Sequence, residues 1–222
     1  MVQKYHIIII ITKTMVIYYR IKDKIFNLFK SKVLRNMYMG TRLSKPVWEN
    51  QFDSGYWDYL YSDDEKEHYS CICDFYSKFA LGKSVLDVGC GQGVLYHYLT
   101  ENIDKTIEYF GIDISSNAVE LAKKQFPDCH FMQLDFDRDG LEQKFDVIIF
   151  NETLYYFDQP LKTIQESANS NLNRGGHFIV SMFDIPANDK IWQVLHEEYL
   201  FIEVKNISNL KGQKWRVGMF KP

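Results

Sequence analysis

The sequence predicts an α/β fold, a doubly wound and mostly parallel sheet with helices on both faces. From residue 82 onward, short apolar runs alternate with stretches of helical periodicity, which is typical of a parallel sheet. The first run, Ser84–Val88, leads into glycines at positions 89, 91 and 93 and then into a helical pattern. A strand that ends in such a turn brings bare backbone against a ligand. The last two runs have no convincing helix between them, so we expect an antiparallel pair at one sheet edge.

The strands are predicted from short runs rich in β-branched and aromatic residues. The first four of them end at or beside polar residues, and ligands of open parallel sheets bind where the strands end. In chain order, the predicted strands are Ser84–Val88, Ile107–Asp113, His130–Leu134, Phe145–Phe150, Gly176–Met182, Leu200–Lys205 and Lys214–Phe220.

Helices are predicted before and between these strands from their periodicity. Residues 117–125 (NAVELAKKQ) are good helix formers, and Ser115 or Ser116 is expected as the N-cap. In chain order, the predicted helices cover residues 66–79, 94–102, 116–126, 159–172 and 187–199.

The chain of 222 residues is long enough for one sizeable core and an appendage. Residues 1–46 carry a net charge of +9 and residues 47–222 one of −12, so we expect a basic N-terminal extension followed by an acidic domain. An acidic domain argues against nucleic acid as the main partner. Residues 47–80 are rich in aromatics and are predicted to form a lid, with breaks at Pro46 and Gly55.

Residues 1–46 raise the question of a membrane. Apolar residues at helical spacing between Ile21 and Val33 alternate with lysines. Such a segment can lie on an anionic membrane surface, pack on the acidic domain or be a poorly ordered extension. The apolar run Ile7–Ile11 is too short for a signal peptide or a membrane span. We therefore expect a cytoplasmic protein, with peripheral membrane contact through residues 1–46 as one alternative.

The four cysteines predict neither a disulfide framework nor a zinc site. Cys71 and Cys73 are not a CxxC pair, and no second pair or histidine cluster completes a metal site with Cys90 or Cys129. We expect reduced thiols and no metal.

The glycine-rich stretch 87–93 (DVGCGQG) decides between kinds of nucleotide site. A dinucleotide fingerprint that starts at Gly89 needs a third glycine or alanine where Val94 stands, and a phosphate-binding loop needs a lysine. Asp87, inside the apolar strand, is foreign to the dinucleotide fingerprint, and an unpaired buried carboxylate there is energetically costly. The stretch instead resembles motif I of class I S-adenosylmethionine-dependent methyltransferases.

The resemblance covers residues 82–220 and implies a seven-stranded sheet of order 3-2-1-4-5-7-6 with the last strand antiparallel. It also implies S-adenosylmethionine as the cofactor. The acids that end strands two and three, Asp113 and Asp135, would hold the ribose and the adenine, and Asp87 the amino-acid portion. No metal ligand is implied. The implied cofactor-binding residues are Asp87, Gly89, Cys90, Gly91, Gly93, Asp113, Ile114, Asp135, Phe136, Asn151, Trp48, Tyr56 and Trp57.

The acceptor is less well defined by the sequence. Stretches 48–60 and 151–157 resemble small-molecule methyltransferases of the NodS-like and sugar-modifying kind, which implies transfer to an oxygen or nitrogen of a small molecule, with a sugar as one candidate. Glu152 is the candidate base, with Tyr155, Tyr156 and Asp58 after it. The alternatives are a non-catalytic protein that keeps the cofactor fold and a nicotinamide-dependent oxidoreductase.

Overall fold

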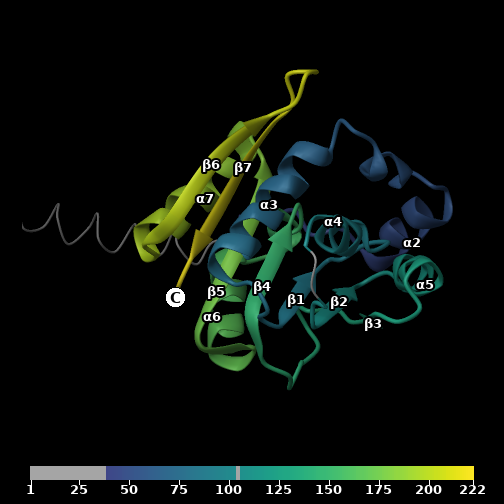
Figure 1. Ribbon diagram of the computed structural model, residues 1–222, viewed down its shortest axis with the longest axis horizontal. Coiled ribbons are helices and arrows are strands. Elements are labelled where there is room, and N and C mark those ends of the chain that lie inside the picture. The colour runs from purple at the N-terminus through teal and green to yellow at the C-terminus, as the bar shows by residue number, and fades with distance from the viewer. Residues whose placement is uncertain (1–38, 104–105) are drawn as a thin grey trace, which may run out of the picture. The chain divides into compact units, whose positions relative to one another are not determined.

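The computed structural model describes residues 39–103 and 106–222 (Figure 1). The predicted amphipathic helix between Ile21 and Val33 and the run Ile7–Ile11 lie outside these residues. Within the described part of the chain, no helix has both the length and the hydropathy that a membrane span requires.

The seven-stranded sheet has the order β3-β2-β1-β4-β5-β7-β6, as the resemblance implied. Neighbouring strands from β3 through β5 pair in parallel, and β7 pairs antiparallel to both β5 and β6. The strands are β1 Val85–Val88, β2 Tyr109–Asp113, β3 His130–Gln133, β4 Phe145–Asn151, β5 Leu172–Phe183, β6 Phe201–Ser208 and β7 Lys214–Phe220.

Three strands extend beyond the predicted bounds, β4 by the single residue Asn151. β5 begins four residues earlier than expected because Leu172 pairs with Phe145 across an irregularity in the β4 ladder. β6 runs on to Ser208, because its pairing with β7 continues to the turn between the two strands.

Helices cover both faces of the sheet because successive side chains of each strand point to opposite sides. Val85 faces the core cluster that contains residues of α3 and α4, whereas its neighbour Leu86 faces the cluster that contains residues of α6 and α7 (Figure 1). The helices of this domain are α3 Lys66–Phe79, α4 Val94–Asn102, α5 Ser116–Gln125, α6 Pro160–Ser170 and α7 Pro186–Glu198.

The lid differs in extent from the prediction. Helix α2 (Lys45–Asp53) contains Pro46 in its first turn, where a missing N–H costs nothing, so Pro46 does not break the chain there and the predicted boundary after residue 46 lies inside a helix. Helix α3 is a core helix whose Ile72 and Phe75 are fully buried. The segment that remains above the sheet, residues 45–61 with α2 and the short 3₁₀ helix Asp58–Tyr61, is called the lid below.

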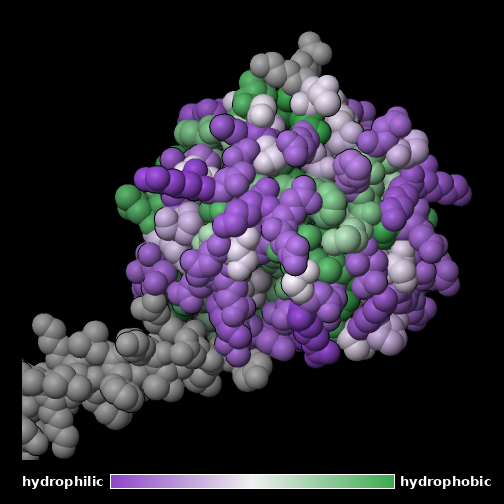
Figure 2. All heavy atoms as spheres, turned by 90° about the horizontal axis from the view of Figure 1, so that it is seen from below, coloured by the Kyte–Doolittle hydropathy of each residue, from purple (hydrophilic) through white to green (hydrophobic). Residues whose placement is uncertain are grey.

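The surface of the protein carries mostly hydrophilic side chains, as is usual for a globular protein. On the face seen in Figure 2, hydrophilic side chains surround a smaller region of apolar ones. The described residues contain no group of three or more His, Cys, Asp or Glu that could hold a metal ion.

Candidate functional site

The turn between β1 and α4 is held open toward the site by its glycines. Gly89, Gly91 and Gly93 have φ angles of 79°, 53° and 86°, which favour residues without a Cβ. The amides of Gly89 and Cys90 donate to the Ile112 carbonyl at 2.7 and 2.9 Å. The chain here lies so close to Thr153 that a Cβ on Gly89 would sit 2.3 Å from its Cγ2. The turn therefore presents backbone where a side chain would block access.

A cavity of about 570 Å³ lies over the carboxyl ends of β1 to β4 and beneath the lid. It brings together most of the sequence-predicted site residues. Tyr56 is an exception, since it is 59% exposed and is not among the lining residues, and Gly93 instead occupies the N-cap position of α4. The predicted residues that line the cavity are Trp48, Trp57, Asp87, Gly89, Cys90, Gly91, Asp113, Ile114, Asp135, Phe136, Asn151, Glu152, Tyr155 and Tyr156.

Asp113 is fixed by two backbone donors at the end of β2. Its Oδ2 accepts from the Gly91 amide at 2.9 Å and its Oδ1 from the Ser115 amide at 2.8 Å. Burial raises the pKa of Asp113 to about 6, against the effect of these two bonds. Each oxygen retains a second lone pair, which is what a ribose diol requires.

Two buried acceptor atoms at the ends of β1 and β4 have no partner among the described residues. Asp87 is 2% exposed, its Oδ2 accepts from the Tyr109 hydroxyl, and its Oδ1 is unpaired. Asn151, at 8% exposed, likewise leaves Oδ1 unpaired. Burial raises the pKa of Asp87 to about 7. Unsatisfied buried acceptors are costly, so both atoms fit a ligand that brings donors, such as the ammonium group of a methionine moiety.

Asp135 has a partner that the sequence did not reveal. Arg42 binds the Asp135 Oδ2 through one guanidinium nitrogen and Asp137 through the other at 2.7 Å. This leaves Asp135 Oδ1 for the adenine amino group that the resemblance implied, with Phe136 beside it in the cavity wall. Arg42 belongs to the predicted basic extension, and its charge alone does not indicate that it binds residues 93 and 95 positions away.

Glu49 fastens the lid to the core, and sequence reasoning missed it as well. Its carboxylate accepts from the Ser115 and Ser116 hydroxyls, both at 2.6 Å, and from the Ser116 and Asn117 amides, both at 2.9 Å. These donors form the first turn of α5, where Ser115 also caps the helix by accepting from the Ala118 amide. Although burial opposes the shift, the hydrogen bonds lower the pKa of Glu49 to about 2.

The Glu49→Gln variant is expected to unfold more easily by about 2 kcal/mol at pH 7, because charge-assisted hydrogen bonds are replaced by weaker ones. The native pKa lies below the unfolded value, so this contribution is present above pH 4.5 and is lost as the pH falls toward 2. Urea unfolding at pH 7 and pH 3 measures it. Glu120→Gln, an exposed position on α5, is the matched control. A difference that stays the same at both pH values would contradict the assignment.

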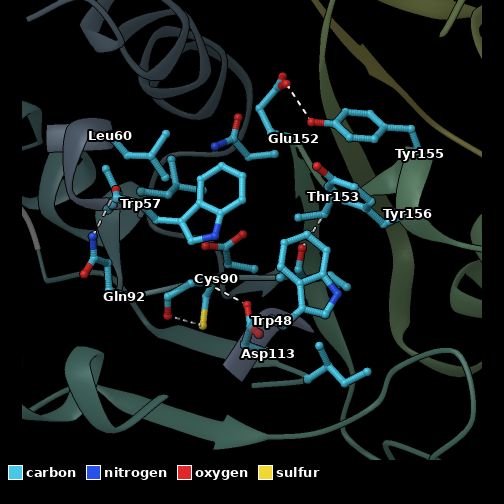
Figure 3. A pocket seen from close by; sticks show the side chains of 18 of the residues that line it. Trp48, Trp57, Leu60, Cys90, Gln92, Asp113, Glu152, Thr153, Tyr155 and Tyr156 are labelled. Carbon is cyan, nitrogen blue, oxygen red and sulfur yellow. Dashed lines mark hydrogen bonds between the residues drawn. The ribbon is translucent and has the colours of Figure 1, made fainter. Parts of the chain in front are cut away.

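Glu152 lies at the other end of the cavity in a strained backbone conformation, with a φ of 56°. Its carboxylate accepts from the Tyr155 hydroxyl at 3.1 Å, the Ser181 hydroxyl at 3.1 Å and the Phe183 amide at 3.0 Å. Burial nevertheless raises the pKa of Glu152 to about 7. In Figure 3, Glu152 and Tyr155 lie on one side of the lid tryptophans, and Cys90 and Asp113 on the other.

Aromatic side chains close the lid over this cavity. Trp48 of α2 meets Tyr156 edge-on at 4.7 Å between ring centroids, and Trp57 stacks near Trp48 at 6.1 Å. Asp58, a lesser candidate base, is not among the lining residues, although Gln92 contacts it at 3.5 Å. The lid thus supplies apolar walls, and the strand ends supply the polar groups.

Comparison with known proteins identifies the family of the chain. Residues 81–216, more than half of the chain, match a family model described as a methyltransferase domain. The chain belongs to this family. The match confirms the resemblance seen in the glycine-rich stretch, and with it S-adenosylmethionine as the cofactor.

Curated relatives of the methyltransferase domain match over part of their length. A malonyl-(acyl-carrier protein) O-methyltransferase of Anoxybacillus flavithermus is 28% identical over 121 residues, 54% of this chain and 44% of the relative. A ubiquinone biosynthesis O-methyltransferase of Alkalilimnicola ehrlichii is 27% identical over 125 residues, 54% of this chain and 49% of the relative. The chain therefore spans less than half the length of these relatives.

Solved structures share the fold of the domain. Magnesium protoporphyrin IX methyltransferase from Synechocystis PCC 6803, crystallised with S-adenosylmethionine, has a TM-score of 0.63 at 18% identity over 81% of this chain and 98% of its own. The N-methyltransferase NodS from Bradyrhizobium japonicum WM9, crystallised with S-adenosylhomocysteine, has a TM-score of 0.63 at 18% identity over 79% of this chain and 96% of its own. In both cases the alignment with this chain covers nearly the whole length of the solved structure.

Proposed function

We propose that the protein transfers a methyl group from S-adenosylmethionine to an oxygen or nitrogen of a small molecule. The observation that carries this proposal is one continuous cavity whose wall includes both the polar strand end at Asp113 and the half-buried Glu152. One half has the polar atoms that the cofactor needs, and the other half leaves space for an acceptor.

The cofactor supplies an activated methyl group on a sulfonium, so the main task of the protein is to align the acceptor with it. In this proposal Asp113 binds the ribose hydroxyls, and Asp135 with Phe136 holds the adenine. Asp87 and Asn151 accept hydrogen bonds from the ammonium group through their unpaired Oδ1 atoms.

Glu152 is proposed as the base that takes the acceptor's proton. A base works best when its pKa lies near the working pH, and the pKa of Glu152 is about 7. The donors from Tyr155, Ser181 and Phe183 fix the direction of its carboxylate. Tyr155 is therefore a positioning residue in this proposal.

The partner class follows from the size and charge of the site. A cavity of about 570 Å³ is of the size that small-molecule ligands occupy, and a sugar is one candidate acceptor. The net charge of −12 on residues 47–222 disfavours nucleic acid. A cytoplasmic location, with peripheral membrane contact through residues 1–46, stays a prediction.

Two experiments test this function. Calorimetry should detect binding of S-adenosylhomocysteine and none of NAD, and Asp113→Ala should abolish the former. Incubation with methyl-labelled cofactor and a small-molecule cell extract should then label an acceptor with the wild-type protein and none with Asp113→Ala. Binding without any labelled product would favour the non-catalytic alternative, and NAD binding would favour the oxidoreductase.

Cofactor binding is expected to release protons near pH 6. The pKa values are about 7 for Asp87 and about 6 for Asp113, and donors from a ligand favour the charged carboxylates. S-adenosylhomocysteine affinity should therefore fall as the pH drops from 7 to 5. Because both native pKa values exceed the unfolded ones, the same groups stabilise the ligand-free fold below pH 4 and lose that effect as the pH rises through 7.

Calorimetry of S-adenosylhomocysteine binding in two buffers of different ionisation enthalpy measures the proton release directly. A binding enthalpy that does not depend on the buffer at pH 6 would contradict it.

A further inference from the structure

Glu65 is a buried carboxylate in the cavity wall that no structural role accounts for. It is 6% exposed and occupies the N-cap position of α3, yet its side chain accepts no hydrogen bond from that helix. Its contact with His68 Nδ1 is 3.7 Å, which is too long for a hydrogen bond. In residues 39–103 and 106–222, no donor forms a hydrogen bond with the Glu65 carboxylate.

The groups around Glu65 do not neutralise it. His68 is fully buried against Trp215, with 4.8 Å between ring centroids, and burial lowers its pKa to about 3, so it is uncharged at neutral pH. Lys211 is bound to Asp64. Burial and the charge of Asp64 raise the pKa of Glu65, and Lys211 opposes this only in part.

Glu65 lines the same cavity as the proposed base and several aromatic side chains. Its charge contributes to the raised pKa values of Glu152, Tyr59 and Tyr69, which all line the same cavity. The charge of Asp87 also contributes to the raised pKa of Tyr69. The acceptor half therefore combines two carboxylates with aromatic faces, a pairing that suits a cation.

The described residues that line this half include no cationic side chain that could pair with an anion. Among the described residues that line the cavity, Arg42 is the only Lys, Arg or His, and it is bound to Asp135 and Asp137 beside the adenine position. A phosphate or carboxylate acceptor would meet Glu65 and Glu152 with no counter-charge, and burying such like charges together is costly.

We infer that the acceptor half of the cavity binds a small organic cation, an amine attached to an apolar or aromatic group, with Glu65 as its anionic anchor. This rests on the proposed methyl transfer, whose acceptor class it names. The bound ammonium gives one proton to Glu152. Its freed lone pair then forms the N–C bond to the methyl carbon while the C–S bond breaks, and that electron pair stays on sulfur as S-adenosylhomocysteine.

Three probes of nearly the same shape test the charge preference: phenethylamine, 2-phenylethanol and phenylacetate. Each is titrated into wild-type protein saturated with S-adenosylhomocysteine, with ligand-detected NMR as the readout. We expect phenethylamine to bind at least about tenfold more tightly than phenylacetate, a difference of about 1.4 kcal/mol. Equal or tighter binding of phenylacetate, or no amine binding at about 10 mM, would overturn the inference.

The Glu65→Gln variant should weaken phenethylamine binding about tenfold or more and leave S-adenosylhomocysteine affinity unchanged. Glu67→Gln removes the same charge from an exposed position of α3 and should change neither affinity. Unaltered amine affinity in Glu65→Gln would overturn the assignment of Glu65. If the wild-type protein did not bind S-adenosylhomocysteine, the proposed function itself would be refuted. Failure of the inference about Glu65 and failure of the proposed function are therefore distinguishable.

Discussion

Replacement of Gly89 with alanine is expected to weaken S-adenosylhomocysteine binding roughly a hundredfold, because small displacements of positioning groups have effects of that size. Two causes add up. The φ of 79° is unfavourable for any residue with a Cβ, and the new Cβ would lie 2.3 Å from Thr153 Cγ2. Thr153 cannot yield freely, since its hydroxyl donates to the Val88 carbonyl at 2.8 Å. The turn must therefore shift away from the ligand position.

Gly82→Ala separates the two causes. Gly82 has a φ of 78°, within a degree of Gly89, and no heavy atom within 4 Å of the added Cβ. Its alanine variant should lose about 1 kcal/mol of unfolding free energy from the backbone alone and keep its cofactor affinity. Gly89→Ala should lose a further 1 to 3 kcal/mol or so from overpacking. Equal losses in the two variants, measured by urea unfolding, would show that Thr153 yields freely.

Glu152→Gln is expected to lower turnover by about 10² to 10⁴, the range that a positioned base contributes. The measurement uses the acceptor labelled in the extract experiment, and cofactor affinity should stay within about twofold because Glu152 lies at the acceptor end. In the wild type, turnover should fall on the acid side of about pH 7, where the carboxylate is protonated. Unchanged turnover in Glu152→Gln would remove Glu152 from the mechanism.

Tyr155→Phe is the companion variant for Glu152. The Tyr155 hydroxyl lowers the pKa of Glu152 by donating to it, so its removal should shift the acid limb of the pH profile to higher pH. A merely structural role of Tyr155 would change the rate and leave the limb where it was.

The sequence predicted those site residues that belong to a short, recognisable segment of the chain. The glycine turn after β1 and the acids at the ends of β2 and β3 each follow a recognisable strand, so Asp87, Asp113 and Asp135 could be placed before the structure was known. Their common position follows from a parallel sheet, which brings strand ends to one edge.

The site residues that the sequence did not predict are side chains whose partners lie far away in the sequence. Glu49 reaches Ser115 and Arg42 reaches Asp135 across a contact that no local pattern encodes. Glu65 lies at the start of a helix, where an acidic residue is common, so its position in the sequence does not mark it as a site residue. Pro46 was a separate difficulty, because proline interrupts the interior of a helix but is well tolerated in its first turn, where it lies in α2.

The bond between Glu49 and α5 has a kinetic consequence. All four of its donors belong to the protein, so the roof over the cavity is fastened whether or not a ligand is inside. We expect a molecule as large as the cofactor to enter fastest in the intervals when these bonds open together. Association should be slower than the typical encounter rate of about 10⁵ to 10⁷ M⁻¹s⁻¹, and product departure should be slowed by the same event.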